Sequence, residues 1–227
     1  MEVSGLNIYD TLLQLPLFQG MGQNDLTQVV GHTRFEFSRH EKNDVIVQEG
    51  HPCTSMVFLT RGVLSIRSIS DNHYVEVVEQ VNAPILLQPE HLFGLTQRYS
   101  QTFIACSERC DTLSISKEEV NRLLGTFEIF RTNLLNIIST QSQRRARIPW
   151  RLHPRSIHEK IVRFFVDHCQ YPSGEKSIHM KMQVLATEIG ESRLNVSKAL
   201  HKMEESGLLK VSREHIHIPR MEDFFKL

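Results

Sequence analysis

The chain has 227 residues, 40% of them hydrophobic and 23% charged, which is typical of folded globular domains and excludes a disordered chain. The longest apolar runs, such as residues 85–87, are far shorter than the roughly 20 residues that cross a bilayer, so no membrane span is predicted. The net charge is zero, but residues 1–116 hold 7 Lys+Arg against 13 Asp+Glu (−6), which leaves 19 against 13 (+6) for residues 117–227. This asymmetry predicts two domains, the second facing a polyanion. The first residues lack the basic start of a secretory signal, so we expect a cytoplasmic protein.

Short stretches of alternating character fill residues 1–116, separated by Gly, Pro and Asn. Seven of them are predicted strands, at residues 34–37, 44–47, 56–59, 63–66, 74–78, 102–105 and 112–115. Strands at such close spacing are typical of an antiparallel β jelly roll or barrel. A sandwich of this kind can enclose a small molecule, so residues 1–116 are predicted to be an effector-sensing domain.

The four cysteines, Cys53, Cys106, Cys110 and Cys169, are scattered and match no common spacing of zinc ligands. We expect reduced structural thiols and no metal. A cupin-like metal enzyme is an alternative use of such a barrel. It needs a His-x-His with a nearby Glu inside the barrel strands, whereas the His-x-His of this chain is His215–His217, followed by a proline.

Residues 117–148 are predicted to form a short helix and a long one. Ser116 with Glu119 makes a capping box, in which each side chain satisfies an unpaired backbone N–H of the helix start. In the long helix, from about residue 127 to 147, apolar residues recur at coiled-coil spacing; they are Phe127, Phe130, Leu134 and Ile137. These four are the predicted dimer interface. An amphipathic helix that lies on its own domain is the alternative.

Pro149 and Pro154 then interrupt the helical pattern and predict a hinge. The final domain is expected to span residues 149–227 and to begin with a second capping box, Ser156 with Glu159.

A helix-turn-helix is predicted at residues 184–205. A short helix over 184–189 precedes Gly190, which supplies a left-handed turn, and Ser192, which caps the next helix. That helix, 193–205, turns apolar residues inward and polar residues outward. The stretches 208–211 and 215–218 then alternate as a β-hairpin, which predicts a wing.

The outward residues of the second helix suit the edges of DNA bases. Arg193 can fork onto guanine, and Asn195 can pair with adenine. Lys198 and Lys202 lie one and two turns further along and can reach bases or phosphates. Thr187 and Ser192 lie near helix starts and suit phosphate oxygens.

With these motifs, the chain resembles the cyclic AMP receptor and fumarate–nitrate reduction (CRP/FNR) family of transcription regulators. Residues 15–18 (LPLF), the barrel segment 50–62 and residues 189–198 (IGESRLNVSK) are similar to the family's opening helix, barrel motif and "IG-x-S-R-E-T-V-x-R" motif. The resemblance implies that Arg193 is the leading recognition arginine and that Lys198 stands for a second arginine. Leu194 replaces the family's glutamate with an apolar group suited to a thymine methyl, so we expect a half-site other than TGTGA.

The resemblance also implies an effector pocket, with Glu90, Tyr99 and Ser100 as its predicted residues. Family members that bind cyclic nucleotides have a glycine where this chain has Pro89, and an arginine directly before the hydroxyl residue. Both are missing, so cyclic AMP is not the expected effector. An iron–sulfur cluster is excluded because the cysteines are not clustered. Haem remains open.

The chain is therefore predicted to be an α+β protein with an N-terminal antiparallel jelly roll like that of cyclic-nucleotide-binding domains, a long dimerisation helix and a C-terminal winged helix-turn-helix. It is expected to be a homodimeric DNA-binding transcription regulator with no catalytic or metal site. Its expected partners are a double-stranded DNA operator and RNA polymerase. A regulator that responds to a cyclic nucleotide is the alternative.

Overall fold

The computed structural model describes residues 5–225, which form two compact units. The first unit comprises the described part of residues 1–64 together with 82–147. The second comprises residues 65–81 together with the described part of 148–227. A segment of the predicted sensing domain thus belongs to the same unit as the predicted DNA-binding domain.

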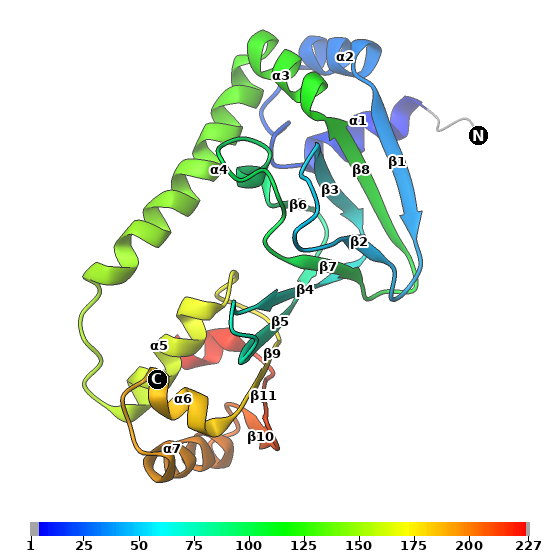
Figure 1. The fold of residues 1–227 in the computed structure, drawn as a ribbon. Coiled ribbons are helices and arrows are strands. Elements are labelled where there is room, and N and C mark those ends of the chain that lie inside the picture. Colours follow the sequence, from blue (N-terminus) through cyan, green and yellow to red (C-terminus); the bar gives the residue numbers. More distant parts are fainter. Residues whose placement is uncertain (1–4, 226–227) are drawn as a thin grey trace. The chain divides into compact units, whose positions relative to one another are not determined.

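The first unit is an antiparallel β structure with helices at its ends (Figure 1). Its helices are α1 (Gly5–Gln14), α2 (Gln23–His32), the 3-10 turn η1 (Pro89–His91), α3 (Lys117–Thr126) and α4 (Glu128–Arg147). Its strands are β1 (Phe35–His40), β2 (Val45–Val47), β3 (Ser55–Arg61), β6 (Ile85–Leu87), β7 (Thr102–Ala105) and β8 (Cys110–Ser116). Four of these strands form a sheet in the order β1-β8-β3-β6, and β2 pairs with β7.

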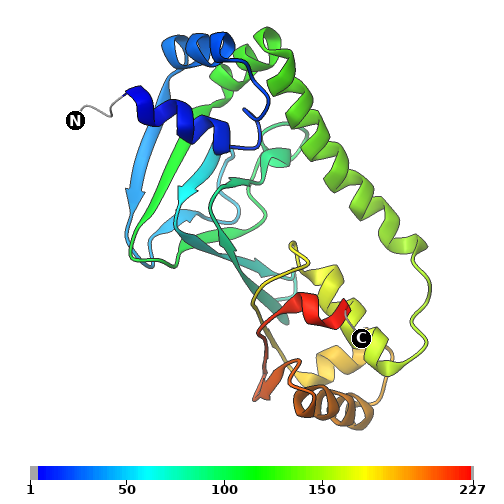
Figure 2. The same ribbon diagram turned by 180° about the vertical axis from the view of Figure 1, so that it is seen from behind.

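Aromatic side chains hold the helices of the first unit to its sheet. Phe18, which follows α1, packs on Phe58 of β3 at 6.1 Å and on Phe130 of α4 at 5.2 Å between ring centroids. All three are fully buried. α2 and α3 lie side by side at one end of the unit (Figure 2), where Arg122 donates a hydrogen bond of 2.6 Å to the carbonyl oxygen of His32. One half of the capping box predicted at Ser116 is formed, since its hydroxyl accepts from the N–H of Glu119 at 3.3 Å. The Glu119 carboxylate pairs with Arg122 instead of with the N–H of Ser116.

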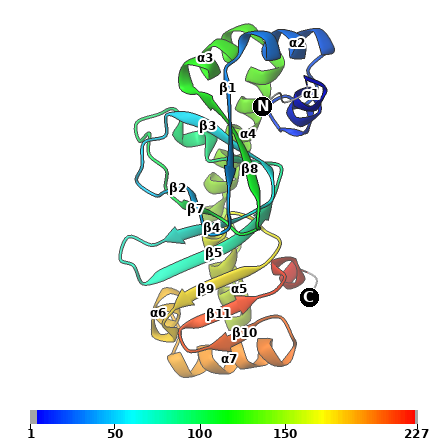
Figure 3. The same cartoon turned by 90° about the vertical axis from the view of Figure 1, so that its right-hand side faces the viewer.

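The second unit is a sheet with three helices on one face. Its strands are β4 (Val63–Ile69, which begins in the first unit), β5 (Val75–Asn82), β9 (Lys176–Met180), β10 (Lys210–Ser212) and β11 (His215–Ile218). Its helices are α5 (Ile157–His168), α6 (Met182–Glu188) and α7 (Arg193–Glu205), with 3-10 turns η2 (Ile148–Trp150) and η3 (Met221–Phe225). Figure 3 shows β4, β5, β9, β11 and β10 side by side in that order.

The seven strands predicted in residues 1–116 and the two predicted for the wing are all present, and the predicted α+β architecture is confirmed. Two of the strands in residues 5–225 were not predicted. β6 is a three-residue apolar run without alternation. β9 alternates, but its first inward residue is a lysine, Lys176, which is fully buried. A charged residue at a core position conceals the strand pattern.

Candidate nucleic-acid interface

The helix-turn-helix is built from α6, a tight turn and α7. Gly190 in the turn has a φ of +65°, the left-handed conformation that glycine adopts without steric cost. Ser192 is the N-cap of α7, and its hydroxyl oxygen accepts from the N–H of Asn195 at 3.2 Å. Leu185 and Ala186 of α6 are fully buried, so the two helices cross closely.

The inward and outward faces of α7 are sharply different. The side chains of Val196, Ala199, Leu200 and Met203 are buried in the core of the second unit. Arg193, Asn195, Lys198 and Lys202 are all exposed, as their spacing predicts. Leu194, between the first two, is 64% exposed although it is apolar. An exposed leucine among basic and amide side chains suits a surface that contacts both base edges and thymine methyl groups.

The two predicted hydroxyl contacts have different surroundings. Ser192 uses its oxygen as an acceptor in the cap, which leaves its hydroxyl proton available to a phosphate. Thr187 donates its proton to the carbonyl oxygen of Gln183 within α6, at 3.0 Å. In this geometry Thr187 has no proton to give to a phosphate, so the predicted contact from Thr187 is not supported.

An ion pair that the sequence did not reveal fixes the turn to α5. Lys160 of α5 lies 2.7 Å from the carboxylate of Glu191, and the N–H of Glu191 donates to the carbonyl of Ala186 at 2.9 Å. The hydrogen bond from Lys160 lowers the pKa of Glu191, so this carboxylate is charged at neutral pH. The two residues are 31 positions apart, and local periodicity contains no signal for such a pair.

The wing consists of β10 and β11, joined through Arg213 and Glu214. β11 pairs with β10 on one side and with β9 on the other. Its N-terminal residue, His215, stacks on His179 of β9 at 4.6 Å between ring centroids. Glu204 of α7 accepts from the N–H of Val211 at 2.9 Å, which fastens the wing to the end of the recognition helix.

Comparison with known proteins assigns both parts of the chain. Residues 159–224 match the model of the Crp-like helix-turn-helix domain, and residues 37–127 match that of the cyclic nucleotide-binding domain. The chain belongs to the CRP/FNR family of transcription regulators. No curated protein sequence matches it.

Solved structures of CRP/FNR regulators share this fold. The catabolite activator protein of Thermus thermophilus is 14% identical, with 93% of this chain and 97% of that one covered and a TM-score of 0.50. The sensor domain of the regulator DNR from Pseudomonas aeruginosa is 18% identical, with 67% of this chain and 97% of that one covered and a TM-score of 0.53. No described helix of this CRP/FNR chain is long and apolar enough to cross a membrane.

The loop of this CRP/FNR regulator that the family resemblance aligns with the phosphate loop of cyclic-nucleotide-binding members makes hydrogen bonds within itself. Gln88 is buried, and its amide nitrogen donates to Ser100 at 2.7 Å and to Gln101 at 2.9 Å. Its amide oxygen accepts from the N–H of Ser100 at 3.1 Å. Arg98 donates to the carbonyl oxygen of Gly50 at 2.7 Å. The polar groups of this loop are therefore paired with one another, and its arginine is bound elsewhere.

Glu90, the predicted ribose acceptor, has a different environment. Both carboxylate oxygens are inaccessible to solvent and accept no hydrogen bond from the described residues. Arg145 of α4 approaches one of them at 3.5 Å. The carboxylate of Glu90 thus lies beside a cation of α4, while the neighbouring loop is paired with itself.

Tyr99, also predicted for the effector pocket, lines a different cavity. Its side chain is buried, and its hydroxyl donates to the carbonyl oxygen of Ser55 at 3.2 Å. Burial raises the pKa of Tyr99, so its hydroxyl stays protonated. The cavity measures about 310 Å³ and is lined on its other sides by β2, His51 and Val57. Glu90 and Ser100 are not among its lining residues, so the three predicted pocket residues do not form one site.

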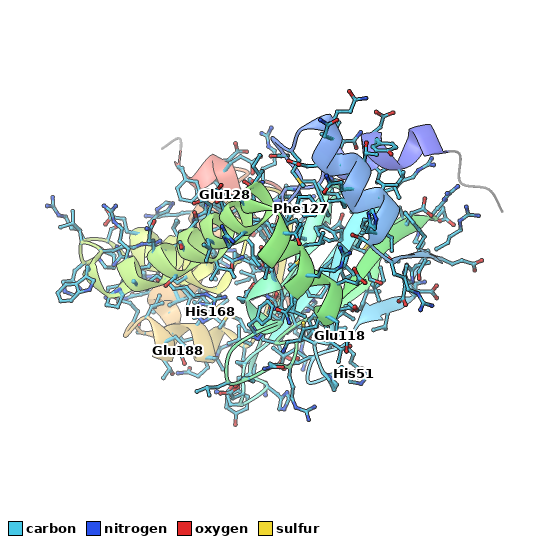
Figure 4. All side chains as sticks on the ribbon, turned by 90° about the horizontal axis from the view of Figure 1, so that it is seen from above. His51, Glu118, Phe127, Glu128, His168 and Glu188 are labelled. Carbon is cyan, nitrogen blue, oxygen red and sulfur yellow. The ribbon has the colours of Figure 1, made fainter. Side chains whose placement is uncertain are left out.

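The predicted dimer seam of α4 is largely internal to the chain. Figure 4 marks Phe127 and Glu128 where α3 passes into α4. Phe127, Phe130 and Leu134 are buried in the first unit, and Ile137 is half-buried. As a correction, three of the four predicted interface residues hold the helix to its own domain. The exposed apolar residue of α4 is instead Leu135, at 57%, with Ile129 at 36%.

Proposed function

We propose that this CRP/FNR regulator binds an operator of twofold symmetry as a homodimer, with one α7 in the major groove of each half-site. The observation that carries the proposal is the outward face of α7, where Arg193, Asn195 and Lys198 are exposed on a helix whose other face is locked into the core. A helix held in this way presents its first two turns to base edges.

Each outward residue has a chemical role in the proposed complex. The guanidinium of Arg193 donates to O6 and N7 of a guanine, and the amide of Asn195 pairs with N6 and N7 of an adenine. Leu194 contacts a thymine methyl. Lys198 reaches a base or a flanking phosphate, and Lys202 and Ser192 contact phosphates, which fix the register of the helix.

A second copy of the chain is the proposed partner of the exposed face of α4. The helix is 20 residues long, and Leu135 leaves an apolar group on a side that its own domain does not cover. Two such helices related by a twofold axis would bury Leu135 of each against the other. The dimer would place two recognition helices about 34 Å apart, one turn of B-DNA.

The proposed effector is not a cyclic nucleotide, because the loop that would hold its phosphate is paired internally. The cavity beside Tyr99 is the proposed effector site, for a small molecule whose identity its lining does not specify. We propose that the protein works in the cytoplasm, has no catalytic role and acts through RNA polymerase.

The proposal is tested by selecting binding sites from random duplex DNA with the full-length protein. We expect a near-palindrome whose half-sites are centred about 10 base pairs apart and contain a guanine. Selection of no sequence, or of an asymmetric single site, would contradict it. Calorimetry with cyclic AMP and cyclic GMP tests the effector proposal, which is wrong if either binds at micromolar concentration.

A further inference from the structure

The β4–β5 hairpin lies within residues 37–127, which match the cyclic nucleotide-binding domain model, yet its residues 65–81 share a compact unit with residues 148–227. β5 pairs antiparallel with β9 over five residues, from Val75 opposite Met180 to Glu79 opposite Lys176. β9 in turn pairs with β11 of the wing. The hairpin is therefore a continuation of the wing sheet (Figure 3).

The inward face of β5 is part of the core beneath the recognition helix. Val75 and Val77 are 7% and 2% exposed, and they belong to the same apolar cluster as Phe165 of α5, Ile178 of β9 and Leu200 of α7. Without β5, β9 would be an edge strand with unpaired backbone groups, and this core would lose one wall.

A buried ion pair fastens the hairpin to β9. Glu79 and Lys176 are both fully buried, and their charged atoms lie 3.2 Å apart. The Glu79 carboxylate also accepts from the backbone N–H groups of Gln170 at 2.8 Å and Tyr171 at 3.1 Å. Lys176 donates to the carbonyl oxygen of Ser173 at 2.6 Å. The pair thus ties β5 both to β9 and to the loop that follows α5.

The chain passes between the two units three times, after Leu64, Val81 and Arg147. Two of these passages lie within β4 and next to the end of β5, so strands as well as the segment after α4 connect the units. We propose that the DNA-binding domain is discontinuous in sequence, that β5 is one of its structural strands, and that Glu79 and Lys176 are positioning residues for α7.

This inference rests on the proposed function, and the full-length protein tests it with the Glu79→Gln variant. The substitution leaves Lys176 buried without a counter-charge, which strongly destabilises its surroundings. We expect amide hydrogen exchange to accelerate at least tenfold in both β5 and β9, and operator binding to weaken at least tenfold. Glu76→Gln is the matched control, because Glu76 lies on the same strand but pairs with Arg67 on the outward side. This variant should change the exchange rates and the operator affinity less than threefold.

The double variant Glu79→Gln with Lys176→Met shows whether the effects of Glu79→Gln come from the unpaired charge of Lys176 or from general misfolding. It removes the unpaired charge, while the new amide side chain on β5 keeps an oxygen for one of the two backbone N–H groups. We expect at least half of the lost protection and of the lost operator affinity to return. Faster exchange confined to β5, with β9 and α7 unchanged, would overturn the proposal, because the hairpin would then be an appendage.

A disulfide tests whether the paired hairpin is the form that binds DNA. Val78 and Ser177 lie directly opposite each other on the outward side, so Val78→Cys with Ser177→Cys can join the two strands. We expect the oxidised protein to bind the operator within threefold of the reduced one. If only the reduced protein binds, the hairpin must separate from β9 before DNA binds, and the proposal is wrong. If wild type binds no operator, the proposed function fails, while the exchange results still decide whether β5 belongs to this domain.

Discussion

At the residue scale, specificity depends on side chains whose direction is set by the helix that carries them. The spacing of apolar residues within 193–205 was enough to predict which side chains face outward, because a helix repeats every 3.6 residues. The ion pair of Lys160 with Glu191 could not be predicted in this way. It joins residues that only the folded chain brings together.

Replacing Arg193 with alanine should weaken binding to the selected operator by about 1–3 kcal/mol and relax the preference for one guanine. Fluorescence anisotropy with operators altered at each position measures both effects. Lys202→Ala is the control, since loss of a phosphate contact should weaken all sequences alike and reduce the salt slope by about 1. Equal binding by wild type and Arg193→Ala would refute the arginine assignment.

The wing should lose stability as the solution becomes acidic. Burial, with the neighbouring His179 and His217, lowers the pKa of His215 from its ordinary value of 6.5. The folded state therefore holds fewer protons on His215 than the unfolded chain, so stability is complete above pH 6.5 and falls as the pH drops towards the folded pKa.

Thermal unfolding between pH 8 and 5 tests this dependence. His215→Gln removes the titrating group, so its melting temperature should fall less on acidification than that of wild type. An equal fall in both proteins would show that His215 does not contribute.

At the scale of elements, α4 shows what an apolar pattern does and does not reveal. Its spacing predicted a helix with an apolar face, and both are present. The pattern cannot say which surface covers that face, because packing on the same chain and packing on a second copy bury the same residue types. Phe130 meets Phe18 of its own domain, and the sequence contained no sign of that contact.

Two substitutions in α4 should therefore have different effects. Phe130→Ala removes a fully buried ring and should destabilise the first unit by about 3–5 kcal/mol.

Leu135→Glu should leave the melting temperature of the monomer unchanged but abolish the dimer. Light scattering after gel filtration measures the mass of each variant, with Asn136→Glu as the control on a neighbouring position of the helix. A Leu135→Glu dimer as tight as wild type would exclude this face as the interface.

At the scale of the whole molecule, the chain passes between the two units at three points, whereas the sequence predicted a single passage. The sequence predicted one hinge, between Pro149 and Pro154, and the second unit includes the chain from Ile148 onward. It did not predict that residues 65–81 join that unit, because the alternation of a strand shows its faces but not its neighbours. Because the buried Lys176 interrupts the apolar pattern of β9, the sequence predicted neither β9 nor its pairing with β5.

A nick in the connection after α4 should leave the molecule in one piece. Trp150 is 86% exposed in this connection, so brief chymotrypsin treatment should cut there. The two fragments should elute together from a gel-filtration column under native conditions, because β5 remains paired with β9. Separate elution of the two fragments would show that the strand pairing cannot hold the units together.

Methylation interference on the selected operator tests most directly whether the outward face of α7 contacts the major groove. Methyl groups on guanine N7 lie in the major groove, where Arg193 is expected to bind. We predict interference at one or more guanines in each half-site, and loss of that interference with Arg193→Ala. Interference at adenine N3 in the minor groove alone, or none at guanine N7, would contradict the account.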